Sequence, residues 1–438
     1  MLSIDTRNYS KKIINKHISL SSCENNYIVL NYDPKYISID DDWSVTKYRS
    51  VIIDPATHHL LCVAPWGAMT KLTHDYDMDE NTKLICPENV NMYADTTVFE
   101  TDDAKYIADE MVEGTMINLF YDERNGKWQI ATRSAITGNY WFYRTEYGNT
   151  ECHQKSFYQM MMEALRYDMD TSLENIALLN DLPTHYCYSF VLQHPENHIV
   201  LSVTQPNLYL VGVFEIINRT TTGDVCVYNE TEHAWNQEPR VRYINTHSYT
   251  ALTLFQEWFN VGILHLPKIL YADSIAELKE KYCSETSSLD YMGVMITNIF
   301  NGYHISIDNP RYQALKELRG NNPNLQYHFL ALNKIDKINE FLVAFPIYVH
   351  AFHHFRTQYN RFIALIHHLY VSYYIKKDKS PIDKQYFVHV ANIHHTFYIP
   401  GITSGNKIIV TFDIIKKYFD EMDPSRVLYY INYDATQV

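Results

Sequence analysis

The chain has 438 residues, of which 46% are apolar and 20% are charged, and its formal net charge is −14. This composition is ordinary for a globular protein, and the length allows two or three domains. The acidic balance disfavours extensive nonspecific binding to nucleic-acid backbones, which usually requires a basic surface, although a local basic groove is compatible with it. The seven cysteines form no CxxC pair, which argues against a zinc ribbon or a disulfide framework and indicates a reducing compartment.

The hydropathy pattern does not indicate a membrane protein. No apolar run approaches the about 20 residues that a spanning helix needs, and the first 20 residues lack the apolar core of a signal peptide. We therefore expect a soluble protein of the cytoplasm with no membrane partner.

Residues 1–330 are rich in predicted strands. Short apolar or alternating runs recur at 48–65, 114–122, 127–134, 186–193, 198–203, 208–217 and 303–308. Asn125-Gly126 separates two of them and predicts a hairpin over Ile117–Arg133. Helical spacing of apolar residues is interleaved irregularly, at 155–168, 250–260 and 274–283. This irregular alternation favours an α+β fold over a doubly wound parallel sheet.

The character of the sequence changes near residue 331. Residues 338–377 predict a long helical stretch, interrupted near Pro346, and residues 384–399 and 411–422 continue the helical pattern. The sequence therefore predicts two domains, an α+β domain at 1–330 and a helical domain at 331–438.

Histidines with metal-ligand spacing occur in the helical region, at His350, His353 and His354. They stand among bulky apolar residues and outside any HExxH motif, so we interpret them as the polar flank of a packed helix. His58-His59 is assigned to a turn between strands. The chain has no GxGxxG, Walker A or GxSxG motif. We expect neither a metal nor a resident cofactor, although a noncovalently bound nucleotide is compatible with the sequence.

Four segments combine charged or small residues with predicted strands. Lys47–Lys71 places Arg49 before a strand, turn and strand, and Met111–Ser134 places Glu113-Gly114 before the hairpin and Arg133 after it. Ser189–Val200 reads "SFVLQHPENHIV", and Tyr291–Gly320 reads as two strands followed by a basic stretch.

In this order, the four segments resemble motifs of the covalent nucleotidyltransferases, specifically phage-type RNA ligases of the RNA ligase 1 kind, and the chain looks closest to ligase-like proteins of large DNA viruses. The resemblance implies an antiparallel-sheet nucleotidyltransferase domain followed by a helical module. It also implies a host cytoplasm or viral factory as the location. The candidate nucleotide- or RNA-binding residues that it marks are Arg49, Glu113, Gly114, Arg133, Asn197, Arg311, Lys316 and Arg319.

The residues that carry chemistry in this family are replaced. The resemblance implies a lysine nucleophile at position 111, where Met111 stands, and a thioether cannot form a phosphoramidate. The expected carboxylates fall on Val191 and Met292, and the two lysines of the last strand fall on His304 and Ser306. Such lysines would neutralise phosphate charge during transfer.

Three functions are compatible with this pattern. The first is a pseudoenzyme that binds RNA, RNA ends, caps or nucleotides, with Glu113 and Arg133 as polar contacts. In a purely structural interpretation, these two residues only cap or pair within the sheet. The second is an active ATP-dependent ligase with a different nucleophile, and the third is an assembly protein that binds other proteins and uses the fold as a scaffold. We expect the first, without covalent adenylylation.

Overall fold

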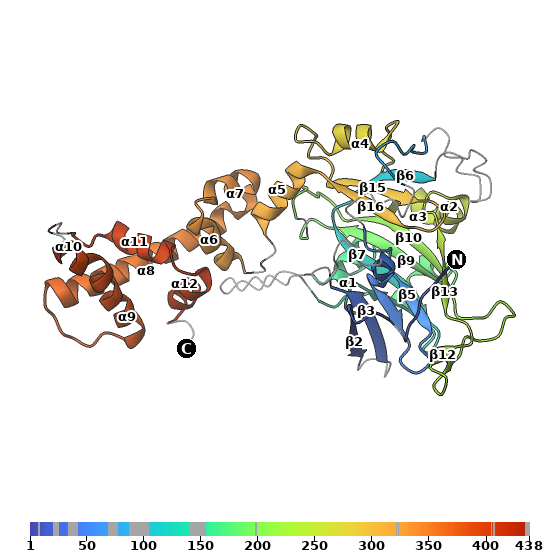
Figure 1. Ribbon diagram of the computed structural model, residues 1–438, viewed down its shortest axis with the longest axis horizontal. Coiled ribbons are helices and arrows are strands. Elements are labelled where there is room, and N and C mark those ends of the chain that lie inside the picture. Colours follow the sequence, from blue (N-terminus) through green and yellow to red (C-terminus); the bar gives the residue numbers. More distant parts are fainter. Residues whose placement is uncertain are drawn as a thin grey trace. The chain divides into compact units, whose positions relative to one another are not determined.

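The computed structural model describes residues 1–7, 9–20, 26–33, 43–68, 78–86, 105–140, 155–197, 199–320, 322, 324–403, 405 and 408–433. The described chain forms two compact units, one within residues 1–316 and one within residues 317–438. The first combines antiparallel sheets with helices and the second is helical (Figure 1), which confirms the expected α+β class. The units divide after Lys316, inside the helix that spans Pro310–Arg319, and residue 330 lies in helix α6 (Leu325–Lys334) of the second unit.

A large sheet lies at the centre of the first unit. Its strand order is β1-β13-β10-β9-β7-β8, and β14 pairs with β10. All of these pairings are antiparallel except that between β10 and β14. The strands of this sheet are β1 (Leu2–Ser3), β7 (Thr115–Asp122), β8 (Lys127–Ala131), β9 (Tyr186–Gln193), β10 (Asn207–Ile217), β13 (Arg240–Ile244) and β14 (Leu264–His265).

Alternation along these strands gives the large sheet two buried faces. Ile117 and Leu119 of β7 belong to a core shared with α1 (Phe157–Ala164), α2 (Tyr249–Leu254) and α3 (Gln256–Asn260). Phe120 and Cys187 belong to a second core, on the side of a four-stranded sheet. This second sheet has the order β2 (Ile13–Ser19), β3 (Asn26–Tyr32), β4 (Val51–Ile53) and β5 (Leu60–Val63).

A three-stranded antiparallel sheet completes the main part of the first unit. Its order is β16 (His304–Asp308), β15 (Gly293–Asn298) and β6 (Tyr106–Glu110), and α4 (Ile275–Tyr282) packs on it (Figure 1). A short ribbon of β11 (Tyr228–Asn229) and β12 (Ala234–Trp235) stands apart from it. Helix α5 (Pro310–Arg319) follows β16.

The hairpin predicted over Ile117–Arg133 is confirmed by β7 and β8, and Gly126 takes the left-handed conformation (φ 67°) that its turn requires. The strand predicted at 198–203 was wrong for the described residues 199–203, which form no strand. The amides of Ile199, Val200 and Leu201 donate to a buried carboxylate instead of a neighbouring strand. His58-His59 lies between β4 and β5, as expected.

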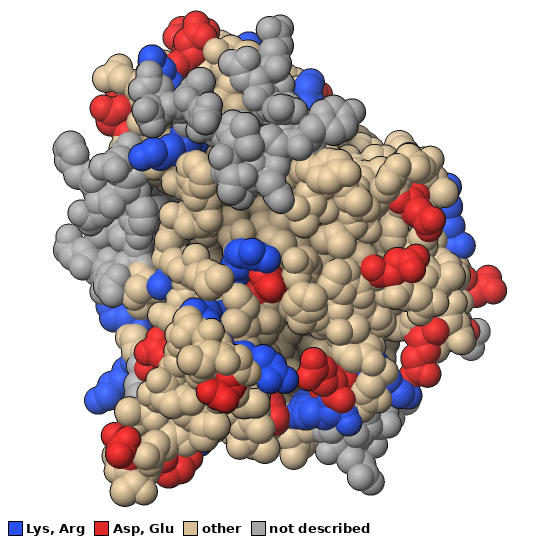
Figure 2. Space-filling model, turned by 90° about the vertical axis from the view of Figure 1, so that its right-hand side faces the viewer, with Lys and Arg blue, Asp and Glu red and all other residues tan. Residues whose placement is uncertain are grey.

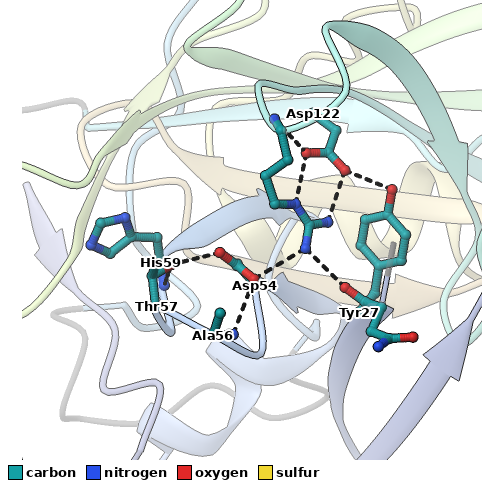
Figure 3. A network of polar contacts seen from close by, with 8 residues as sticks. Tyr27, Asp54, Ala56, Thr57, His59 and Asp122 are labelled. Atoms are coloured by element: carbon teal, nitrogen blue, oxygen red, sulfur yellow. Dashed lines mark hydrogen bonds and ion pairs between the residues drawn. The ribbon is translucent and has the colours of Figure 1, made fainter. Parts of the chain in front are cut away.

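An ionic network joins the hairpin to the four-stranded sheet (Figure 3). The Arg124 guanidinium donates from Nε and Nη2 to the Asp122 carboxylate at 2.9 and 2.8 Å, and from Nη1 to Asp54 at 3.0 Å. Tyr27 of β3 donates to Asp122 at 2.7 Å. Burial opposes ionisation of Asp122, but these donors lower its pKa. The network therefore fixes the two sheets to each other at charged groups.

The second unit is built from helices around an aromatic core. Phe341 and Phe352 stack at 4.8 Å, and Phe329 meets Phe352 edge to face. The helix predicted from 338 is interrupted at the turn Pro346–Tyr348 as expected. The helices after α6 are α7 (Ile338–Ala344), α8 (Val349–Tyr370), α9 (Lys384–Ile393), α10 (Ile399–Thr403), α11 (Phe412–Asp420) and α12 (Pro424–Ile431). Across the described residues, no helix is both long and apolar enough to cross a bilayer.

Candidate functional site

A cavity of about 370 Å³ in the first unit gathers most of the positions that the sequence motifs mark. Its volume lies within the range of small-molecule sites, about 300 to 1,000 Å³. Its walls come from the large sheet, the four-stranded sheet and the three-stranded sheet, and from loops next to them. The residues that line it include Tyr32, Arg49, Asp109, Glu110, Met111, Gly114, Met116, Arg133, Val191, Phe214, Tyr243, Met292, Met295, Gly302 and His304.

Met111 is fixed in the cavity wall by the residue opposite it. It directly follows β6, and its amide donates to the carbonyl of Gly293 at 2.9 Å. A Cβ atom on Gly293 would lie 3.0 Å from the Met111 sulfur and 2.3 Å from the carbonyl oxygen of Ile307. A side chain at position 293 would collide with the Ile307 carbonyl, so only glycine fits there, and the Met111 sulfur packs against it.

The other replaced positions divide into two groups. Val191 of β9, Met292 before β15 and His304 of β16 line the same cavity as Met111. Ser306 also lies on β16, but it is not among the residues that line the cavity. Four of the five replaced positions therefore converge in space although they are spread over nearly 200 residues of sequence.

His304 contributes an uncharged imidazole. It is 5% exposed, and burial together with the nearby Arg49 lowers its pKa to about 4. Its Nδ1 lies 3.1 Å from the Gly302 carbonyl, which accepts a hydrogen bond from it. At neutral pH, this position adds no positive charge to the cavity.

Two arginines supply the positive charge of the cavity. Arg133 follows β8, donates to the Tyr32 carbonyl at 2.8 Å, and lies over the Tyr32 ring at 5.3 Å. Arg49 precedes β4, and burial together with the charge of Arg133 lowers its pKa. The two guanidinium groups are therefore close enough to repel each other, which an anion between them would relieve.

Glu113 does not face the cavity. Its carboxylate is 2% exposed and accepts hydrogen bonds from the amides of Ile199 (2.6 Å), Val200 (3.0 Å) and Leu201 (3.0 Å), and from the Tyr312 hydroxyl (2.6 Å). All of these donors are the protein's own, so the geometry agrees with the structural interpretation of Glu113. Gly114, by contrast, lines the cavity, and a Cβ there would lie 2.4 Å from the carbonyl oxygen of Leu192.

The remaining candidates do not come together as one surface. Asn197 donates to the Thr115 hydroxyl at 2.7 Å and does not line the cavity. Arg311 donates to the Ser287 carbonyl at 2.8 Å, while Lys316 is exposed. Arg319 is 2% exposed, and its guanidinium donates to the Tyr348 hydroxyl at 2.8 Å. The phosphate-binding face expected from Arg311, Lys316 and Arg319 is therefore not an exposed cationic stripe.

Several cavity residues were not identified from the sequence. Met295 lies on β15 two positions after Gly293, so strand alternation alone could have placed it on the same face. Asp109 is paired with buried His247, whose Nε2 lies 3.0 Å from its carboxylate. Burial opposes the protonation of His247, but Asp109 raises its pKa. No local sequence motif could predict this pair, because its members are 138 residues apart.

A larger cavity, of about 600 Å³, lies beside Arg124 and Glu215. Two of its charged side chains are paired, Arg124 with Asp122 and Glu215 with Arg242. Within the described ranges, no three His, Cys, Asp or Glu side chains are grouped as metal ligands.

No protein-family model matches the chain. The chain is 30% identical to an RNA ligase of Rhodothermus phage RM378 over 105 residues, which span 24% of this chain and 22% of the ligase. The chain thus matches less than a quarter of that relative. This partial match supports the RNA-ligase-like resemblance of the motifs.

Solved structures with related shapes are also RNA ligases. The Naegleria gruberi RNA ligase with PPi matches 58% of this chain and 65% of its own, at 7% identity and a TM-score of 0.30. An archaeal ATP-dependent RNA ligase matches 75% of this chain and 64% of its own, at 9% identity and a TM-score of 0.32. Similarity at this level places no ligand in the cavity.

Proposed function

We propose that the protein is a catalytically degenerate RNA-ligase-like protein that binds a nucleotide or an RNA end noncovalently in the 370 Å³ cavity. The observation that carries this proposal is the convergence of Met111, Val191, Met292 and His304 on one cavity that also holds Arg49 and Arg133. The cavity keeps groups that can bind an anion and a flat apolar ligand, while the groups for covalent transfer are replaced.

The chemistry of the lining supports binding over transfer. Nucleotidyl transfer through a covalent intermediate needs a nucleophile such as a lysine amine. Among the described residues that line the cavity, none is a lysine. Lys127 is engaged elsewhere, because its amine pairs with Glu174 at 2.5 Å at the turn end of the hairpin. Lys105 directly precedes β6, which ends at Glu110, so it lies at the opposite end of this strand from Met111.

The distribution of charge supports a small ligand rather than a long RNA. On the face in Figure 2, Lys and Arg side chains are interspersed with Asp and Glu and form no continuous basic surface. The formal net charge of −14 also argues against binding a long RNA. Tight contact with many phosphates would need several unopposed cations along a groove, whereas one nucleotide or one RNA end needs only the cavity.

Two measurements on the full chain test the proposal. Isothermal titration with nucleotides and with short RNA should detect binding, and Arg49→Gln should weaken it. Incubation with α-labelled ATP or GTP followed by denaturing electrophoresis should leave the protein unlabelled. A labelled band would indicate an active ligase with another nucleophile. The absence of any binding to a folded protein would leave the scaffold role, which a pull-down of protein partners would then address.

A further inference from the structure

The charges around the cavity limit how many phosphate groups a ligand can carry. Among the described lining residues, two arginines, Arg49 and Arg133, are balanced by two carboxylates, Asp109 and Glu110. His304, the remaining basic side chain of this lining, is held uncharged by burial. Counted over these lining side chains, the cavity therefore carries no net positive charge.

The two arginines are suited to one anionic group. Within the described part of the chain, no hydrogen bond or ion pair engages the Arg49 guanidinium. One guanidinium nitrogen of Arg133 donates to the Tyr32 carbonyl, which leaves its other N–H groups able to bind a ligand. Arginine forks bind phosphate oxygens in pairs, so these two side chains can neutralise a single phosphate, which carries about two negative charges at neutral pH.

The two carboxylates of the lining are held in place by other groups. Asp109 and Glu110 end β6. Asp109 accepts from His247 at 3.0 Å, and Glu110 accepts from the Lys268 amide at 3.0 Å. Because these contacts fix both carboxylates at the wall, further phosphate groups would enter a cavity that already contains negative charge. Unpaired like charges in a partly desolvated site are strongly unfavourable.

Much of the remaining lining is apolar, although Tyr243, Thr246 and Thr297 also belong to it. Thioethers of Met111, Met116, Met292 and Met295 face the cavity together with the ring of Phe214. Such polarisable side chains make favourable contacts with aromatic rings. This part of the wall suits a nucleobase better than it suits additional phosphates.

We propose that the cavity selects a ligand with a single phosphate, bound by Arg49 and Arg133, and with its nucleoside against the methionines, and that it discriminates against triphosphates. This inference rests on the proposed function and names its ligand class. A free nucleoside 5′-monophosphate and the 5′-phosphorylated end of an RNA share this chemistry.

The test is isothermal titration of the full chain with the nucleoside, monophosphate and triphosphate of adenine and of guanine, in buffer containing a chelator. We expect a monophosphate of at least one base to bind at least tenfold more tightly than its triphosphate and its nucleoside. A short RNA with a 5′-phosphate, compared with the same RNA with a 5′-hydroxyl, distinguishes the two sources. Preference for the phosphorylated RNA over the free monophosphate identifies an RNA end, and the reverse identifies a free nucleotide.

Variants separate charge from folding. Arg49→Gln should reduce monophosphate affinity at least tenfold and leave nucleoside affinity within about twofold, while the exposed Arg242→Gln serves as the matched arginine control. His304→Lys adds a cation and should shift the ratio of affinities toward the triphosphate. If the unmodified chain binds the triphosphate as tightly as the monophosphate, the inference is wrong but the proposed function stands. If no nucleotide and no RNA binds, both fail.

Discussion

The Tyr312 hydroxyl donates a 2.6 Å hydrogen bond to the Oε2 atom of Glu113, inside a cluster that also holds three backbone amides. Glu113→Ala should lower the free energy of unfolding by at least about 3 kcal/mol, because the buried amides lose their acceptor. Tyr312→Phe should cost about 1.5 to 3 kcal/mol, the range for a hydrogen bond to a charged group.

Urea denaturation followed by circular dichroism measures both effects. The same titrations should show that Tyr312→Phe binds nucleotide as the unmodified chain does, since Glu113 lies outside the cavity lining. If Tyr312→Phe left the stability unchanged but abolished nucleotide binding, Glu113 would instead be a ligand contact.

The Arg124 network offers a second stability prediction. Arg124→Met leaves the fully buried Asp122 carboxylate without its bidentate partner, so we expect a loss of about 3 to 5 kcal/mol. Lys127→Met is the matched control on the same hairpin, because its pair with Glu174 is half-exposed and its loss should cost less than about 1 kcal/mol. Equal losses in urea denaturation would contradict the importance of burial here.

Restoring the missing amine should not restore covalent chemistry. In a Met111→Lys variant, the new amine would stand in a cavity that still lacks carboxylates at positions 191 and 292 and a cation at position 304. Transfer depends on these electrostatic groups as well as on the nucleophile. We expect no labelled protein after incubation with α-labelled ATP and Mg²⁺, for this variant or for the unmodified chain. A labelled Met111→Lys band would show that only the nucleophile is missing.

Stability should fall in mild acid because of three buried histidines. Burial lowers the pKa values of His304, His328 and His389 to about 4, from an ordinary value of 6.5. Between these values the unfolded chain binds more protons than the folded chain, so the stability present above pH 6.5 is lost as the pH falls toward 4. Each histidine contributes a slope of about 1.4 kcal/mol per pH unit in this window.

Urea denaturation at pH 7, 6, 5 and 4 measures the slope. His389→Phe should reduce the pH dependence of the free energy of unfolding by about the contribution of one histidine. The exposed His350→Gln tests for a general effect of removing an imidazole. A slope that His389→Phe leaves unchanged would show that another group controls the acid response.

Much of the strand framework could be predicted because local signals determine it. Asn125-Gly126 between two alternating runs specifies the hairpin, and the apolar spacing at 155–168 specifies α1. Residues 199–203 were predicted wrongly because periodicity cannot show that their amides bind a side chain from 86 to 88 positions earlier. The burial of Glu113 depends on these distant amides and on the hydroxyl of Tyr312, which is also far away in the sequence.

The candidate site was predictable only in part. The order of the motifs identified Met111, Val191, Met292 and His304, and the structure brings them to one cavity. The sequence could not show that Arg319 is buried beside Tyr348, because both lie in helical patterns that leave the direction of a long side chain open. It also gave no sign of the Asp109–His247 pair.

The attachment of the hairpin to the four-stranded sheet has a consequence for ligand exchange. Tyr32, at the end of β3, and Val191, on β9, contribute to the cavity wall from different sheets. Because Arg124 joins these sheets through Asp122 and Asp54, they cannot slide past each other without breaking buried ionic contacts. The conformational entropy of assembling the wall is therefore lost during folding rather than during binding. A preorganised cavity of this kind should bind its ligand in a single rapid step, without a slow rearrangement of the protein.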